Sequence, residues 1–332
     1  MTSEPRVGVI GAGSLGFHHI RILRDFPGIR FSGFSESRAE RAAEVEKELG
    51  VAARSLDDLL SESDAVVVVV PTSAHYKIAA EAIGRGKHVF IEKPITRTVE
   101  EADALLDLAK EKGVLVQIGH IERFNRAVRA ALPYVHAPRF IDSERLATFS
   151  PRGSDVAVVL DLMIHDIDLL LTLVGSVASD ITAVGVPVLT PMLDIANARV
   201  TFESGAVANI TSSRISRERK RKIRIFQQSG YLSLDLGAGT GEFFRLRRDI
   251  DPLAVKAGPV DIAAYVDRIP LEAPDGEPLR LELESFVTAL RNEGPVVVTG
   301  EEGRLALGVA LRIVNEIERT LPSLAGRVLH HA

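Results

Sequence analysis

The chain has 332 residues, of which 46% are hydrophobic and 26% charged, and its formal net charge is −5. These values are typical of a globular protein long enough for two domains, and they give no electrostatic reason to bind nucleic acid. The lack of cysteine excludes disulfides, thiolate catalysis and cysteine-ligated zinc. Because Met1–Pro5 has no signal-peptide pattern and no apolar run reaches about 18 residues, we expect a cytoplasmic protein with no membrane partner.

A short apolar strand is predicted over Arg6–Ile10, and a glycine-rich turn that opens a helix follows it directly. The turn has the pattern G-x-G-x-x-G: Gly11 permits the tight turn, Gly13 lets the backbone approach a pyrophosphate, and Gly16 lets helix and strand pack closely. The phosphates would lie at the helix N-terminus. This context predicts a dinucleotide site with contacts from Gly11, Gly13, Ser14, Leu15 and Gly16.

Glu36 follows the second predicted strand, Arg30–Phe34. A carboxylate at this position accepts hydrogen bonds from the adenosine ribose hydroxyls, so Glu36 favours NAD as the cofactor. Ser35 and Arg38 beside it leave open a site for the 2′-phosphate of NADP.

Strands and helices alternate through the first 120 residues, which predicts a parallel sheet. Five consecutive valines within Ala65–Val70 indicate a central strand buried on both faces. Pro71, Thr72 and His75 lead into the next helix and are candidates for the cofactor site; capping is the alternative for Thr72, and a surface position for His75. The other elements are predicted as helices at Arg38–Leu49, Ser55–Leu60, Ala74–Arg85 and Val99–Lys112, and as strands at Val89–Ile91 and Val114–Gly119.

Lys93 follows the apolar strand that ends at Ile91, and it stands between Glu92 and Pro94. A lysine just past the carboxyl end of a buried parallel strand lies where open α/β sheets bind their ligands. Glu92 is placed to fix this lysine or to tune its pKa. We therefore predict that Glu92 and Lys93 belong to the cofactor and substrate site; the alternative is an ion pair on a solvated loop.

A different architecture is predicted after residue 120. A helix from His120 to about Val135 and an extended segment at Arg139–Thr148 come first. Strands are then predicted at Ala196–Phe202, Ala206–Ile215, Lys222–Gln227, Tyr231–Leu236 and Glu242–Arg247, and helices at Glu282–Arg291 and Gly300–Thr320. Consecutive strands without intervening helices favour an antiparallel sheet. Residues 250–276, with their prolines, glycines and charges, are predicted as a long loop.

The stretch 158–171 is almost wholly apolar apart from Asp161, His165, Asp166 and Asp168. The spacing predicts one helix with Asp161, His165 and Asp168 on a single face. Buried carboxylates and imidazoles need partners or a chemical task. Together with Lys93 they would supply a cation and a titratable base beside a nicotinamide, as oxidation of an alcohol requires. An Asp–His pair held for packing is one alternative; a metal site is another, but no third ligand is evident.

Seven basic residues crowd into the entry of a strand: Arg214, Arg217, Arg219, Lys220, Arg221, Lys222 and Arg224. They form either a solvated strand face that guards against aggregation or, with Arg214 among them, a site for the pyrophosphate of a nucleotide sugar. The loop 149–155 before the predicted helix, which includes Arg152, is either a plain connection or a place of sugar and diphosphate contacts.

The glycine loop, Glu92-Lys93-Pro94 and the spacing from Asp161 to His165 together resemble the glucose–fructose oxidoreductase and inositol dehydrogenase (Gfo/Idh/MocA) family of sugar-handling, nicotinamide-dependent enzymes. The likeness extends to Gly300–Arg304. It implies an α/β fold with a Rossmann domain over 1–120 and, over 121–332, an α/β domain whose large open sheet commonly forms the subunit interface of a homodimer or homotetramer. It also implies that Lys93 is the catalytic lysine and that Asp161 and His165 are the acid/base pair. Glu36 departs from the aspartate of many relatives, which leaves cofactor choice open.

Within that family, Gly119–Asn125 and Leu160–Asp168 resemble bacterial UDP-N-acetylglucosamine 3-dehydrogenases, which feed an aminotransferase in making amino sugars for lipid A or surface glycans. We therefore expect NAD-dependent oxidation of a UDP-sugar, without a metal. The substrate would be held by Lys93, Arg123, Arg152, Asp161, His165 and Arg214. The alternatives are a free sugar or polyol such as inositol, a UDP-hexuronic acid, and a regulator that only senses NAD.

Overall fold

The computed structural model describes residues 4–151, 153, 155–247 and 265–321. Contacts divide the chain into two compact units. Unit 1 comprises the described residues of Met1–Phe124 and Gly276–Gly308, and unit 2 those of Asn125–Asp275 and Val309–Ala332. The first change of unit lies close to the predicted boundary after residue 120, but the return of 276–308 to unit 1 was not predicted.

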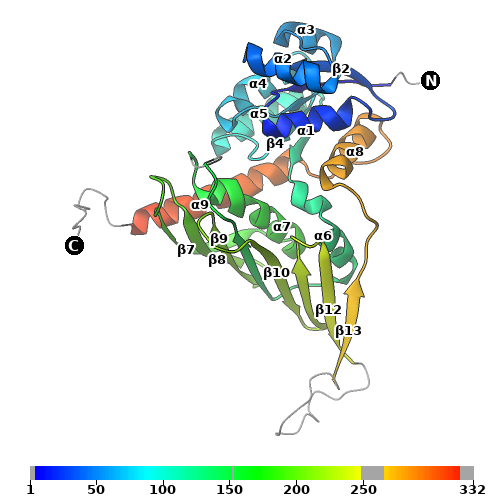
Figure 1. Cartoon of the computed structure of the whole chain (residues 1–332). Helices are drawn as coiled ribbons and strands as arrows, with labels where there is room; N and C mark the ends of the chain where they lie inside the picture. The colour runs from blue at the N-terminus through cyan, green and yellow to red at the C-terminus, as the bar shows by residue number, and fades with distance from the viewer. Residues whose placement is uncertain (1–3, 152, 154, 248–264, 322–332) are drawn as a thin grey trace. The chain divides into compact units, whose positions relative to one another are not determined.

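Unit 1 is built on a parallel sheet in which the described residues form five strands, in the order β2-β1-β3-β4-β5. An isolated parallel bridge between Phe34 and Ala53 adds a position outside β2, which gives the six-place order of a Rossmann sheet. The strands are β1 (Arg6–Ile10), β2 (Arg30–Ser35), β3 (Ala65–Val68), β4 (His88–Glu92) and β5 (Val116–Gly119). The helices between them, blue to cyan in Figure 1, are α1 (Ser14–Leu23), α2 (Ala39–Leu49), α3 (Leu56–Glu62), α4 (Thr72–Gly84) and α5 (Val99–Lys112). The predicted Rossmann fold is confirmed.

Residues 276–308 join unit 1 through apolar packing. Helix α8 (Pro278–Leu290) places Leu283 and Phe286, both fully buried, in the same core as the strands. The Phe286 ring meets the Phe90 ring of β4 edge to face, with 5.8 Å between centroids. Gln117 of β5 donates to the Glu282 carbonyl at 3.2 Å. These contacts bind the segment to the sheet that carries the cofactor motif.

Unit 2 contains a large sheet with eight strands among the described residues, in the order β13-β12-β11-β10-β6-β9-β8-β7. Neighbouring strands are antiparallel apart from β6 and β9, which pair in parallel, so a mostly antiparallel sheet is confirmed. The strands are β6 (Phe140–Leu146), β7 (Ala178–Val186), β8 (Ile195–Phe202), β9 (Val207–Ser213), β10 (Lys220–Gln227), β11 (Gly230–Asp235), β12 (Thr240–Leu246) and β13 (Val266–Leu271).

Two predictions for the part of the chain after residue 120 need correction. The single helix predicted from His120 to Val135 is a 3₁₀ turn at Ile121–Phe124, helix α6 (Arg126–Ala131) and another 3₁₀ turn at Leu132–Tyr134. Asn125 interrupts it because its side chain accepts the Ala127 N–H and caps α6. Part of the predicted loop 250–276 is the edge strand β13, while residues 250–264 lie outside the described residues.

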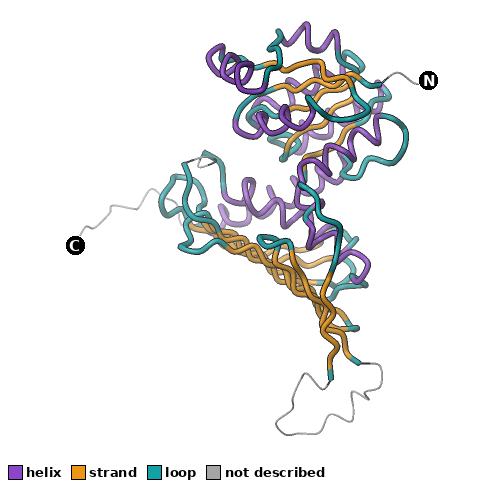
Figure 2. The backbone as a smooth tube through the Cα atoms, turned by 45° about the vertical axis from the view of Figure 1, so that its right-hand side comes forward, coloured by secondary structure: helices purple, strands orange, loops and turns teal. Residues whose placement is uncertain are grey.

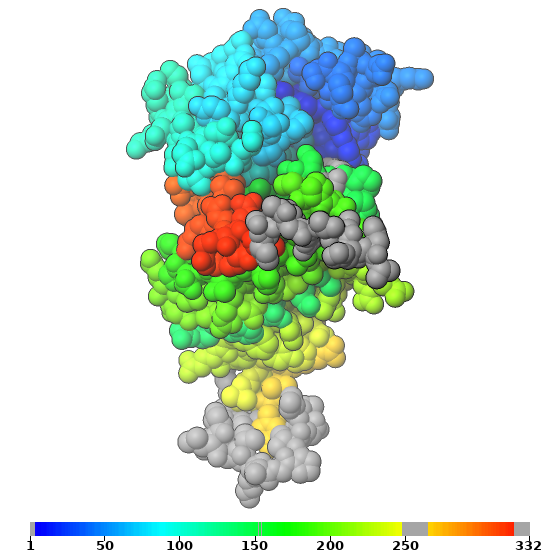
Figure 3. Space-filling view, turned by 90° about the vertical axis from the view of Figure 1, so that its left-hand side faces the viewer, coloured from blue at the N-terminus to red at the C-terminus, as the bar shows by residue number. Residues whose placement is uncertain are grey.

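The helices of unit 2 lie along one face of its sheet (Figure 2). A π-helical turn at Val159–Met163 leads into α7 (Ile164–Val174), and the later part of α9 (Gly300–Thr320) also belongs here. Figure 3 shows the last turns of α9, in red, beside the green strands, where Arg312 donates to the Ala178 carbonyl of β7 at 2.8 Å. None of the helices that the structure describes is long and apolar enough to cross a membrane.

An aromatic ladder crosses four neighbouring strands of the same sheet. Phe140, Phe226, Tyr231 and Phe244 are aligned in register on β6, β10, β11 and β12. Successive ring centroids are 5.7, 5.4 and 4.7 Å apart. All four side chains are half-buried, whereas alternate residues such as Ile225 and Leu232 are fully buried. The ladder therefore stands on the sheet face opposite the core.

Candidate active site

The glycine loop has the geometry that a pyrophosphate needs. Gly11 has φ of +98°, and a Cβ there would lie 2.5 Å from the Val69 carbonyl oxygen. A Cβ on Gly16 would lie 2.1 Å from the Gly11 carbonyl oxygen, so the helix packs against the turn only with glycine. A Cβ on Gly13 would meet nothing within 4 Å. The surface at Gly13 is open at the start of α1, which fits a dinucleotide phosphate.

Glu36 is fixed beside this loop at the end of β2. Its Oε2 accepts the Ala12 N–H at 3.0 Å, and its Oε1 accepts from the backbone and side chain of Arg38 at 3.1 and 3.2 Å. Burial acts to raise the pKa of Glu36, but the hydrogen bonds from Arg38 and Ala12 outweigh it and lower that pKa. The carboxylate is therefore ionised at neutral pH, as an acceptor for ribose hydroxyls must be. The adjacent pocket is lined by Gly13, Ser14, Phe17, His18, Arg38, Arg41 and Glu48.

Of the three candidate residues after β3, Pro71 and Thr72 lie at the surface and His75 is buried. Pro71 is exposed and Thr72 half-exposed at the start of α4, and no side chain caps that helix. His75 is 1% exposed, with Nδ1 2.8 Å from the Pro94 carbonyl oxygen and Nε2 2.9 Å from that of Val70. Burial lowers the pKa of His75, against the effect of both carbonyls. In the structure His75 thus ties the loop after Lys93 to the end of β3, instead of lying on the surface.

Lys93 follows β4, as predicted, and a buried hydrogen-bonded pair supports its backbone. The Lys93 N–H donates to Oε2 of Glu92 at 3.2 Å, and Oε1 of Glu92 is 2.9 Å from Nε2 of His19 on α1. Both side chains are buried, and a Cβ on Gly119 would lie 2.9 Å from the Glu92 carboxylate. Glu92 therefore links helix α1, which follows the glycine loop, to the backbone of Lys93. His19 was not predicted, because a single histidine within a helix carries no distinguishing pattern.

Arg123 is mostly buried and donates to Glu302 of α9 at 2.7 Å. Glu302 also accepts the Thr299 N–H, while the Thr299 hydroxyl accepts the Glu302 N–H, so the two residues form a capping box. Within unit 1, the structure therefore assigns Arg123 and Glu302 of the Gly300–Arg304 motif to the junction of α9 with the turn after β5.

Asp161 lies within the π-helical turn and His165 in the first turn of α7, and both residues are only partly buried. The next residue, Asp166, is buried and forms a bidentate ion pair with Arg145 of β6, at 2.7 and 3.1 Å. This pair anchors α7 to the sheet immediately beside His165. Asp168 is also buried, at 1% exposure, so of the three predicted acidic and basic side chains on this helix only Asp161 and His165 reach the unit's surface.

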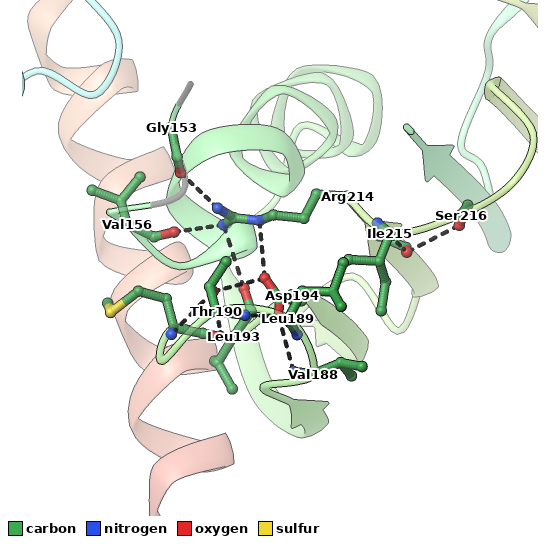
Figure 4. A network of polar contacts seen from close by, with 12 residues as sticks. Gly153, Val156, Val188, Leu189, Thr190, Leu193, Asp194, Arg214, Ile215 and Ser216 are labelled. Carbon is green, nitrogen blue, oxygen red and sulfur yellow. Dashed lines mark hydrogen bonds and ion pairs between the residues drawn. The ribbon is translucent and has the colours of Figure 1, made fainter. Parts of the chain in front are cut away.

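Arg214 is buried, which differs from the predicted contact with a diphosphate. Its guanidinium donates to the carbonyls of Gly153, Val156 and Leu193, and it lies beside Asp194 (Figure 4). Among the described residues, Arg214 thus serves the loop before the π-helical turn. Arg152 lies outside the described residues.

The rest of the basic run lies mainly on the exposed side of β10, where carboxylates of neighbouring strands pair with it. Lys220 pairs with Glu144, Arg224 with Asp142, and Lys222 lies 3.7 Å from Asp235. This arrangement matches the solvated strand face that was one of the two interpretations. No cluster of three potential metal ligands occurs in the part of the chain that the structure describes.

Comparison with known proteins agrees with this geometry. The family described as "Oxidoreductase family, NAD-binding Rossmann fold" matches residues 5–120, and the "GFO/IDH/MocA C-terminal domain" matches residues 117–233. UDP-N-acetylglucosamine 3-dehydrogenase of Acidithiobacillus ferrooxidans is 40% identical over 95% of this chain and 98% of its own. Its solved structure superposes with a TM-score of 0.86, at 38% identity and the same coverage. The scyllo-inositol 2-dehydrogenase (NAD(+)) of Bacillus subtilis is 28% identical over 97% of this chain and 96% of its own.

A Rossmann unit with an open glycine loop, followed by a unit with a large mostly antiparallel sheet, is the architecture of the two-part NAD-binding oxidoreductases that the family models describe. The chain belongs to the Gfo/Idh/MocA family. It is an enzyme, an oxidoreductase of this family.

Proposed function

We propose that this enzyme oxidises the C3 hydroxyl of UDP-N-acetylglucosamine to the 3-keto sugar, with NAD as hydride acceptor. The observation that carries the proposal is the 40% identity with UDP-N-acetylglucosamine 3-dehydrogenase, which extends through both units. The relative named for inositol is only 28% identical over a similar length. Oxidation of a free polyol is therefore the second candidate.

Three residues divide the chemistry in this proposal. When bound, the nicotinamide supplies the acceptor for the hydride that leaves the carbinol carbon. His165 takes the proton of the C3 hydroxyl, because imidazole is the side chain most often used as a general base and that of His165 is partly exposed, within reach of a substrate. Lys93 stabilises the developing alkoxide with its positive charge, and Asp161 orients His165 or relays the proton.

The choice of NAD is proposed from the placement of Glu36. Its ionised carboxylate stands beside the glycine loop, held by the Ala12 N–H, so it is positioned to accept ribose hydroxyls and to repel a 2′-phosphate. Arg38, the group best suited to a 2′-phosphate, is paired with this same carboxylate.

The proposed product is a keto sugar, which an aminotransferase would convert to an amino sugar for lipid A or a surface glycan.

We also propose a homodimer or homotetramer formed through the sheet of unit 2. The face that carries the aromatic ladder lies opposite the helices, and its four rings are half-buried within one chain. Contiguous aromatic surface flanked by charged pairs is typical of a protein interface.

The proposed activity is tested with purified protein, NAD and a substrate panel of UDP-N-acetylglucosamine, its uronic acid, UDP-glucose and inositol. Glutamate and a 3-keto-sugar aminotransferase are added to draw an unfavourable equilibrium forward. We expect NADH formation with UDP-N-acetylglucosamine and its loss in Lys93→Ala. Turnover of inositol without turnover of any UDP-sugar would favour the second candidate, and binding of NAD without any turnover would favour a regulator.

A further inference from the structure

Arg214 and Asp194 form a buried pair where two antiparallel strands meet. Asp194 immediately precedes β8 and Arg214 immediately follows β9, and the Arg214 N–H donates to the Asp194 carbonyl at 3.0 Å. Arg214 is 4% exposed and Asp194 is 0% exposed, and Nε of Arg214 lies 3.8 Å from Oδ1 of Asp194. The register of the sheet therefore fixes this pair independently of any substrate.

Asp194 holds the loop before β8. Its Oδ2 accepts the N–H groups of Val188, Leu189 and Thr190 at 2.9, 2.6 and 2.8 Å, and its Oδ1 accepts the Thr190 hydroxyl at 2.8 Å. With both oxygens engaged, the carboxylate is a rigid anchor for the guanidinium beside it (Figure 4).

Arg214 holds the segment that leads into the π-helical turn. Nη1 donates to the Gly153 carbonyl at 2.6 Å, and Nη2 donates to the Val156 carbonyl and, at 3.3 Å, to the Leu193 carbonyl. The Val158 N–H, at the start of the helix, donates to the same Leu193 carbonyl at 2.9 Å. The guanidinium thus joins the loop around Gly153 and Val156 to the end of the sheet.

Gly153 touches the proposed acid/base machinery. It has φ of +75°, and a Cβ built on it would lie 2.8 Å from Oδ2 and 3.2 Å from Cγ of Asp161. The Asp161 carboxylate therefore lies directly against the Gly153 backbone, whose carbonyl is the one that Arg214 holds. A displacement of Gly153 changes the space available to Asp161.

We propose that Arg214 is a positioning residue: through Gly153 it sets the location of the Asp161 carboxylate. The inference rests on the proposed role of Asp161 in proton transfer. It gives Arg214 a part in the reaction without contact to the sugar or its diphosphate. Misplacing a reacting group by about 1 Å costs up to about 100-fold in rate, so a small movement of this loop has a large effect on turnover.

The test uses Arg214→Lys, which keeps the charge but loses the fork of donors, and Gly153→Ala, whose added Cβ crowds the Asp161 carboxylate. Arg217→Lys is the matched control, because Arg217 is exposed three residues further along the same loop. We expect Arg214→Lys and Gly153→Ala to lower kcat by about 10- to 100-fold, with little change in the KM for NAD. Thermal unfolding identifies any variant that fails to fold. If Arg214→Lys does not fold, Gly153→Ala still tests whether the position of Gly153 affects the reaction.

Pairing with Asp161→Asn separates positioning from a general structural role. If Arg214 acts through Asp161, Arg214→Lys lowers kcat much less in the Asp161→Asn background than in the wild type, and both single variants shift the same limb of the pH–rate profile. Fully multiplicative losses, or unchanged kcat in both Arg214→Lys and Gly153→Ala while Asp161→Asn is impaired, would overturn this inference alone. Wild-type kcat in Asp161→Asn would overturn the proposed role of Asp161 as well.

Discussion

His165 is anchored by its neighbour in the chain. Because Asp166 pairs with Arg145 inside the unit, α7 is held on the sheet, and this fixes the backbone from which the His165 side chain extends. Sequence reasoning proposed His165 and Asp161 as the acid/base pair from their spacing and from the family resemblance. It could not assign Asp166 its partner, because Arg145 lies 21 residues earlier on a strand and only the folded chain brings the two together.

The first prediction concerns His165 as the general base. His165→Asn keeps a polar side chain of similar reach but removes the titratable nitrogen, so kcat should fall by about 10²–10⁴-fold at saturating substrate. Steady-state kinetics with UDP-N-acetylglucosamine measure this, and His136→Asn serves as a control outside the proposed site. Near-normal turnover in His165→Asn would make Lys93 the better candidate for the base.

The second prediction concerns Glu36 and the cofactor. We expect kcat/KM for NAD to exceed that for NADP in the wild type, because the carboxylate accepts ribose hydroxyls and repels a 2′-phosphate. Glu36→Ala should reduce this ratio by at least about 10-fold, since a hydrogen bond to a charged group contributes about 1.5–3 kcal/mol. Glu40→Ala, an exposed change in the same region, should leave the ratio unchanged. A wild-type preference for NADP would point instead to Arg38 as a phosphate ligand.

Among the elements, those buried in unit 1 were predicted closely and those at the edges of the unit 2 sheet were not. Strand β3 was predictable because a strand buried on both faces is a continuous apolar run, here of valines. β7 and β13 are edge strands, so exposed polar side chains interrupt the apolar alternation, and β13 even contains Pro270, which an edge strand tolerates. The π-helical turn was also missed, because its mostly apolar residues are compatible with an α-helix as well as with a π-helix.

The third prediction concerns the loop that Asp194 holds between β7 and β8. Although burial acts to raise the pKa of Asp194, the N–H groups of residues 188–190 and the Thr190 hydroxyl lower it below its usual value of 3.8. Its folded-state pKa is thus below that of the unfolded chain, and its stabilisation is present above about pH 4 and lost as the pH falls toward the folded pKa. Asp194→Asn should therefore cost about 1–3 kcal/mol near neutral pH.

Denaturant unfolding from pH 7 to pH 3 measures this effect. The difference in unfolding free energy between wild type and Asp194→Asn should narrow as the pH falls below about 4. Asp180→Asn, on the exposed face of β7, provides the matched control and should differ little from wild type. A difference independent of pH would show that the loop does not depend on the charge of Asp194.

At the scale of the whole molecule, the sequence predicted two architectures in the right order but not the path of the chain between them. The apolar face of α8 is compatible with packing in either unit, and only contacts of the folded chain, such as that of Phe286 with Phe90, assign it to the Rossmann sheet. Chain order alone therefore predicted a single domain boundary and missed the return of residues 276–308 to unit 1.

The fourth prediction concerns assembly. Phe244→Asp places a charge in the aromatic ladder beside Tyr231, so it should shift the protein toward monomer in sedimentation or light-scattering measurements. Thr182→Asp, on the exposed part of β7, is a control for added charge away from the ladder. A wild type that is monomeric at micromolar concentration, or an unchanged assembly of Phe244→Asp, would contradict the proposed interface.

The ladder also gives this protein an optical property. The chain has no tryptophan and four tyrosines, so its intrinsic ultraviolet emission comes from tyrosine. Tyr231 is stacked between Phe226 and Phe244 on the proposed interface, at 5.4 and 4.7 Å. Dissociation would expose its ring to water. Comparing the emission of wild type and Tyr231→Phe during dilution therefore follows subunit separation without any attached dye.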